Sequence, residues 1–114
     1  MEKHYLLFFS NPVDGREDEY NKWYPADTHL QDVVKVTGFV SSQRFELSEA
    51  QMQAEMPYRY LAVYEIETDD IQSAIDALGK ARNDSMVMSS ALDFTNLQSW
   101  VFTPISDKIF SESL

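Results

Sequence analysis

Two histidines, His4 and His29, are the side chains of this 114-residue chain best suited to act as a general acid or base near neutral pH. His29 follows the tripeptide Trp23-Tyr24-Pro25, where proline interrupts a helix because it removes a backbone donor and crowds the preceding turn. Such a break exposes backbone groups and aims side chains into a cleft, so His29 is the candidate for proton transfer. The alternative is a structural or solvated histidine, a role that we also expect for His4 at the start of the first strand.

Aromatic side chains are frequent, with two Trp, six Tyr and seven Phe in a chain that has only three glycines. They form two groups, one before the helix break and one along a single face of a strand: Tyr20, Trp23 and Tyr24; Tyr58, Tyr60 and Tyr64. So many rings in a small protein indicate a wide interface, an aromatic-lined binding site, or both. The alternative for each group is packing within the core.

Three further residues are candidates for contact with a ligand. Arg44 lies in the middle of a predicted strand, where a cation needs an acidic partner, solvent or an anionic ligand. An ion pair with Glu46 or with an acid of the next strand is the structural alternative. Met86 and Met88 lie over the mouth of a binding site or belong to a solvated loop.

Composition and motifs exclude several classes of function. The net charge of −10 argues against nucleic acids and anionic membranes, which bind basic patches. The chain has no cysteine, its two histidines lack the spacing of a metal site, and no glycine-rich phosphate loop is present. We therefore expect no metal, no nucleotide cofactor and, in the absence of a membrane span or signal peptide, a cytoplasmic protein.

Hydrophobic periodicity positions these residues on four strands and two main helical regions. The first helical region begins with the capping box Asp14-x-x-Glu17, is interrupted at Pro25, restarts near Pro25 or Ala26, and ends before Gly38. Thr68 is the expected cap of the second helix, and residues 82–93 suit a helix extension, a short helix or a flap. The predicted strands cover residues 4–10, 39–47, 58–67 and 97–103.

The order strand, helix, strand, strand, helix, strand predicts an α+β, ferredoxin-like βαββαβ fold over a single domain, residues 1–114. In that fold both helices cover one face of a four-stranded antiparallel sheet. Phe39, Ser41, Gln43, Phe45 and Leu47 are expected to share one face of the second strand. Because the strands carry apolar residues on both faces, the uncovered face needs a partner, and the simplest partner is the same face of a second copy.

The sequence resembles the EthD-like branch of the dimeric α+β barrel superfamily over roughly residues 4–68. The residues that carry the resemblance are Tyr20-x-x-Trp23-Tyr24, His29-Leu30-x-Asp32, Gly38-Phe39 and Arg44-Phe45. The resemblance implies a homodimer with a binding site between sheet and helices in each subunit. It also implies His29 as the proton-transfer residue with a tyrosine beside it; Tyr24, Tyr60 and Tyr64 are the candidates, and no motif selects one of them. Pro25 and the polar loop 48–57 depart from the family pattern.

Two classes of function follow. The first is a cofactor-free lyase, cyclase or isomerase that acts on a small aromatic or polyketide-like compound, with Tyr20, Trp23, Arg44, Tyr60 and Met86 binding the substrate. The second is a non-catalytic binding or accessory protein of a catabolic pathway. A cofactor-free monooxygenase is a further variant.

Overall fold

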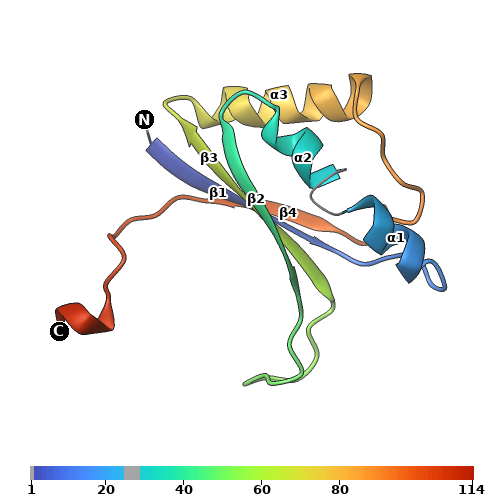
Figure 1. Ribbon diagram of the computed structural model, residues 1–114, viewed down its shortest axis with the longest axis horizontal. Coiled ribbons are helices and arrows are strands. Elements are labelled where there is room, and N and C mark those ends of the chain that lie inside the picture. The colour runs from blue at the N-terminus through green and yellow to red at the C-terminus, as the bar shows by residue number, and fades with distance from the viewer. Residues whose placement is uncertain (1, 25–28) are drawn as a thin grey trace.

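The computed structural model describes residues 2–24 and 29–114, which form a four-stranded sheet with helices beside it (Figure 1). The predicted restart of the first helical region near Pro25 or Ala26 lies outside the described residues. In chain order, the elements are β1 (Glu2–Ser10), α1 (Glu17–Trp23), α2 (His29–Val34), β2 (Phe39–Glu46), β3 (Tyr60–Thr68), α3 (Ile71–Asp84), β4 (Gln98–Phe102) and the 3₁₀ helix η1 (Ser111–Ser113).

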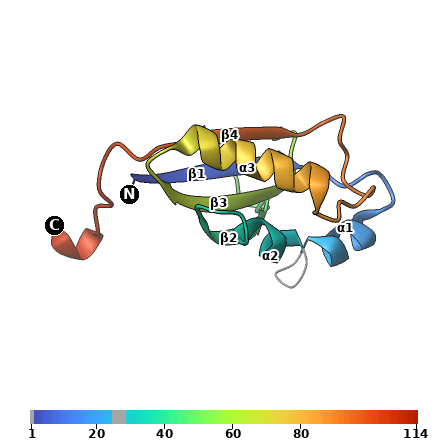
Figure 2. The same cartoon turned by 90° about the horizontal axis from the view of Figure 1, so that it is seen from above.

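The sheet is antiparallel with the strand order β2-β3-β1-β4, which confirms the predicted α+β ferredoxin-like arrangement. Leu6 of β1 lies opposite Tyr64 of β3 on one side and Val101 of β4 on the other. Figures 1 and 2 show that α2 and α3 lie on the same face of this sheet. The core lies between that face and the helices, and every second residue of β1 and β3 is buried there: His4, Leu6, Phe8, Ser10; Tyr60, Ala62, Tyr64, Ile66.

A register shift in β2 corrects one prediction. Phe39 pairs with Ile66, whereas Ser41 pairs with Glu65, so the strand carries an extra residue between Phe39 and Ser41. A one-residue bulge moves the preceding side chain to the opposite face. Phe39 is therefore buried under the helices and does not share a face with Phe45, which is exposed on the other side of the sheet.

Two helix starts also differ from the prediction. Arg16, and not Asp14, precedes α1, and its side chain makes no capping hydrogen bond. Asp70, and not Thr68, caps α3, because its carboxylate accepts a hydrogen bond from the backbone nitrogen of Ser73 at 3.1 Å. The Thr68 hydroxyl instead accepts from the Asp70 nitrogen at 3.0 Å and holds the turn that precedes the helix. In this sequence Thr68 and Asp70 are both suitable caps, and only the second lies three residues before a free helical nitrogen.

The face of the sheet that carries no helix is apolar and open to solvent. Phe102 pairs with Tyr5 and Trp100 pairs with Leu7, so these rings continue the same surface across two strands. More than half of the Trp100 and Phe102 side-chain area is exposed. We call this surface the open face; its apolar side chains are Tyr5, Leu7, Phe9, Phe45, Leu61, Val63, Trp100 and Phe102.

Candidate functional site

A small cavity lies between the sheet and the helices, and three of the candidate catalytic residues, His29, Tyr24 and Tyr64, line it. Its volume is about 20 Å³, which is room for one water molecule. Strands β1 and β3, helices α2 and α3 and the segment between α3 and β4 supply its walls. The lining residues are Leu6, Phe8, Tyr24, His29, Val33, Tyr64, Leu78, Arg82, Met88 and Leu92.

His29 is the first residue of α2 and is 6% exposed. Its imidazole stacks on the indole of Trp23 with ring centroids 4.3 Å apart, and it meets the edge of the Tyr24 ring at 5.3 Å. Among the described residues, no group lies within hydrogen-bonding distance of the buried Nδ1 atom. A buried nitrogen without a partner is unusual in a folded protein and is available to a ligand or a water molecule.

Burial, together with the positive charge of Arg82, lowers the pKa of His29 from 6.5 to about 4. The nearby carboxylate of Asp32 acts in the opposite direction and is the smallest of the three effects. At pH 7 the imidazole is therefore neutral and has a free lone pair, which is the form that a general base requires.

Tyr24 and Tyr64 supply two phenol groups on the same cavity, and each acts on the pKa of the other. Burial raises the pKa of the Tyr64 hydroxyl to about 12 and holds the pKa of Tyr24 well above 10. Both phenols keep their protons at neutral pH and can donate hydrogen bonds. The cavity thus combines a neutral base with two neutral hydrogen-bond donors.

Arg44 does not line this cavity. Its guanidinium carbon lies 4.5 Å from the centre of the Tyr24 ring, 5.1 Å from that of Tyr60 and 5.3 Å from that of Tyr20. The guanidinium also donates a hydrogen bond of 3.0 Å to the side-chain oxygen of Asn21. Arg44 is held by aromatic faces and an amide, where the sequence predicted an acid or a ligand, and the Tyr24 ring that it contacts also lines the cavity.

The other aromatic candidates support the cavity from outside. Tyr20 is fully buried, and its hydroxyl forms a hydrogen bond of 2.7 Å with that of Ser10. The Tyr60 hydroxyl accepts a hydrogen bond from Asn21 at 3.4 Å. The indole of Trp23 stacks on the imidazole of His29. These three residues, predicted to bind substrate, do not line the cavity.

The segment between α3 and β4 closes one side of the cavity. The residues that follow Asp84 form a loop, and Met88, not Met86, lines the cavity; Met86 packs against the core nearby. The indole nitrogen of Trp23 donates to the Val87 oxygen at 2.8 Å, and the Arg16 guanidinium donates to the Ser90 oxygen at 3.1 Å. The loop is thus attached to both ends of α1.

Arg82 is the cavity residue that the sequence analysis missed. It lies on α3 four residues after Leu78, which also lines the cavity, and eight after the buried Ala74. A charged residue that continues the apolar stripe of an amphipathic helix was the available signal. The sequence analysis instead placed Arg82 at the start of the ambiguous segment 82–93.

The contacts of His4 are those of a histidine with a structural role. It is buried, and its Nδ1 atom forms a hydrogen bond of 2.7 Å with the Thr103 hydroxyl. Within residues 2–24 and 29–114, no three His, Asp or Glu side chains gather in a way that could hold a metal ion. No helix of the described part of the chain has both the length and the apolar character that a membrane crossing needs.

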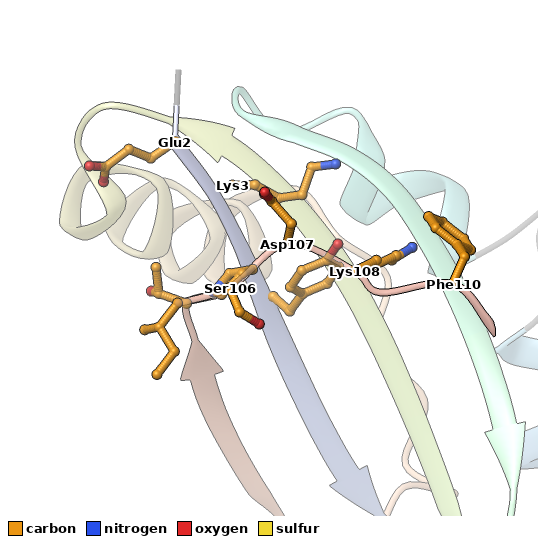
Figure 3. A pocket seen from close by; sticks show the side chains of 10 residues that line it. Glu2, Lys3, Ser106, Asp107, Lys108 and Phe110 are labelled. Carbon is orange, nitrogen blue, oxygen red and sulfur yellow. The ribbon is translucent and has the colours of Figure 1, made fainter. Parts of the chain in front are cut away.

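A larger hollow of about 1040 Å³ lies at the other end of β1 (Figure 3). Its side chains come from the start of β1 and from the exposed segment after β4, and Glu2, Lys3, Asp107 and Lys108 give it mixed charge. None of the candidate site residues lines it. It contains no buried base or nucleophile, so we do not assign the site to this hollow.

Comparisons with known proteins support the fold. A scan against models of protein families finds no match, and neither does a comparison with curated proteins. Solved structures do match. MhuD from Mycobacterium tuberculosis, a heme-degrader with two hemes bound in its active site, is 15% identical with a TM-score of 0.64; the match covers 92% of this chain and 98% of that chain.

Two further structures have the same architecture. An EthD family protein from Bacillus halodurans is 15% identical over 92% of this chain and 100% of that chain, with a TM-score of 0.62. A DABB family protein with a ferredoxin-like fold from Mesorhizobium loti is 10% identical over 93% of this chain and 100% of that chain, with a TM-score of 0.56. The resemblance to EthD-like proteins predicted from the sequence is confirmed at the level of the fold.

Proposed function

We propose that this chain, which has the ferredoxin-like fold of an EthD family protein, is a cytoplasmic homodimer that binds a small aromatic or polyketide-like compound and moves a proton on it. The observation that supports this most directly is the buried, unpartnered Nδ1 atom of His29 on a cavity that Tyr24 and Tyr64 also line. A neutral imidazole removes a proton, and a neutral phenol stabilises the oxygen on which negative charge develops.

The chemical step is an enolisation. The Nδ1 lone pair of His29 takes a proton from a carbon beside a carbonyl group, and the electron pair of the broken C–H bond moves toward the carbonyl oxygen. With a phenol as substrate, the proton comes from the hydroxyl group and the electron pair stays on its oxygen. The Tyr64 hydroxyl, with its pKa raised to about 12, donates a hydrogen bond to that oxygen without losing its proton. Return of the proton to another atom of the substrate completes an isomerisation.

Size favours a compound with one ring. A cavity of roughly 150 Å³ is needed for a single benzene ring, so the cavity of about 20 Å³ has to open before it can bind one. Displacement of Met88 and its loop provides that space without disturbing the strands. A heme, as bound by MhuD, would need a far larger opening than a single ring.

Replacement of His29 by glutamine is expected to slow proton transfer at least 100-fold, because general base catalysis contributes about that factor or more. The measurement is deuterium exchange at the methylene carbon of methyl phenylpyruvate, an enolisable aromatic ketone, followed by proton NMR at pH 7. The matched control is His4→Gln, which alters the other histidine and leaves the cavity intact.

Exchange that is unchanged in His29→Gln would contradict the proposed role of His29. If the folded wild-type protein binds the ketone and does not accelerate exchange, the chain is a binding or accessory protein and the catalytic proposal is wrong. If the protein consumes oxygen with a quinol as substrate and does not accelerate the exchange, it is instead the cofactor-free monooxygenase.

Shortening the side chain that closes the cavity is expected to speed ligand entry. Met88→Ala removes the thioether from the cavity wall, and we expect the association rate of methyl phenylpyruvate, measured by stopped-flow tryptophan fluorescence, to rise about 10-fold. Met86→Ala is the control, since Met86 lies two residues away and does not line the cavity. Equal rates in the two variants would mean that ligands enter elsewhere.

A further inference from the structure

Arg82 places a positive charge on the wall of the candidate cavity. The side chain comes from the last turn of α3, and its guanidinium carbon lies 5.8 Å from the centre of the Phe8 ring, which lines the same cavity. Its charge is close enough to act on two other lining residues, since it lowers the pKa of both His29 and Tyr64. Geometry and electrostatics therefore agree on where the guanidinium lies.

Arg82 differs from the other three arginines in having no polar partner among the residues that the structure describes. Arg16 pairs with Glu19, and Arg59 pairs with Glu17. Arg44 donates to Asn21. Among residues 2–24 and 29–114, no carboxylate, carbonyl or hydroxyl oxygen accepts a hydrogen bond from Arg82, and none of its acids lies within ion-pair distance. A half-buried guanidinium with free donors is costly unless something else satisfies it.

Within the described part of the chain, the cavity offers no anion to satisfy this charge. No aspartate or glutamate of residues 2–24 and 29–114 lines it. Asp32 is the acid that acts on His29, and it pairs with Lys35 at 3.9 Å outside the cavity. Arg44 adds a second positive charge over the Tyr24 ring. This charge partly opposes the rise that burial causes in the pKa of Tyr24 and Tyr64. In a chain with a net charge of −10, two arginines thus lie on or beside the wall of this cavity.

We propose that the ligand of this cavity carries a carboxylate group, which Arg82 binds while His29 and Tyr64 act on the adjacent carbon and oxygen. The planar guanidinium presents paired donors that match the two oxygens of a carboxylate. The substrate class is then a small aromatic 2-oxo acid or a ring that carries both a carboxylate and an enolisable carbonyl. The inference rests on the proposed function, since it uses the same cavity.

The test compares two probes that differ at one group: phenylpyruvate, which carries a carboxylate at pH 7, and its uncharged methyl ester. We expect the wild-type protein to bind the acid at least 10-fold more tightly than the ester, as measured by quenching of tryptophan fluorescence at low ionic strength. Arg82→Gln should abolish the preference for the acid over the ester. Arg82→Lys should retain part of it, since an ammonium group keeps the charge and loses the paired donors.

Lys80→Gln is the matched control, because it removes one positive charge from the exposed side of the same helix and should keep the full preference. Far-ultraviolet circular dichroism and the thermal midpoint establish that each variant is folded. Equal affinity for the two probes in the wild type, a preference that survives in Arg82→Gln, or no binding of the acid at millimolar concentration would each overturn the proposal.

The outcomes separate this inference from the proposed function. If the ester undergoes exchange that depends on His29 and the acid has no advantage, the function holds and the role of Arg82 is wrong. If the acid binds through Arg82 without any exchange, the anion site holds and proton transfer is wrong.

Discussion

A single carboxylate on the open face, introduced by Trp100→Glu, is expected to convert the proposed homodimer into a monomer. Trp100 lies opposite Leu7 and carries an indole that is 57% exposed in the single chain. A second copy that covers this face would bury the indole, and a carboxylate at that position would lose its hydration without gaining a partner. We expect the dimer dissociation constant to rise at least 1000-fold, measured by sedimentation velocity between 1 and 100 μM.

The exposure of Trp100 makes this test specific, because the isolated chain can solvate a glutamate there and stay folded. Met52→Glu is the matched control: it adds the same charge in place of a fully exposed methionine on the loop between β2 and β3. That variant should remain dimeric. A wild-type protein that sediments as a monomer at 100 μM would contradict the dimer, and the open face would then need a different explanation.

The second large effect is a loss of stability in mild acid caused by His29. The unfolded chain binds a proton on this residue at pH 6.5, whereas the folded chain binds it only near pH 4. Between these values the unfolded state holds more protons, so the free energy of unfolding rises with pH. The contribution of His29 is fully present above pH 6.5 and is lost as the pH falls toward 4, a change of about 3 kcal/mol.

Urea denaturation at pH 7.0, 5.5 and 4.5 measures this effect, with His29→Phe as the reference because a phenyl ring can still stack on Trp23. The wild-type protein should lose stability across this range relative to the variant. Glu65 and Asp70 also have lowered pKa values, owing to Lys3 and Ser73, but they titrate in both proteins and cancel in the difference. Parallel pH profiles would show that His29 is solvated in the folded protein.

Periodicity was sufficient to predict the strands and the order of elements, because alternation along β3 and the apolar stripe of α3 are repeated signals. Single-residue events were not predictable in the same way. The bulge after Phe39 leaves no mark on composition, and it reversed the face of that residue. The start of α3 depended on whether Thr68 or Asp70 reached a free backbone nitrogen, which is a matter of geometry.

The residues of the candidate site, like those of the fold, could be predicted only in part. His29, Tyr24 and Tyr64 were chosen from a helix break and a family resemblance, and they lie around one cavity. Met86 was preferred over Met88 without a physical reason, because a loop has no periodicity that decides which side chain points inward. Arg82 was missed because its segment was read as ambiguous, although its position on the apolar side of α3 was visible in the sequence.

The walls of the cavity have a consequence for how the protein folds. Leu6, Tyr64 and Leu92 meet there from the beginning, the middle and the last third of the chain, and β1 joins them by pairing with both β3 and β4. Such contacts between distant parts of a sequence form slowly, since long loops must close before any contact rewards them. The nascent chain therefore has no partial version of this site, and ligand binding becomes a sensitive reporter of complete folding.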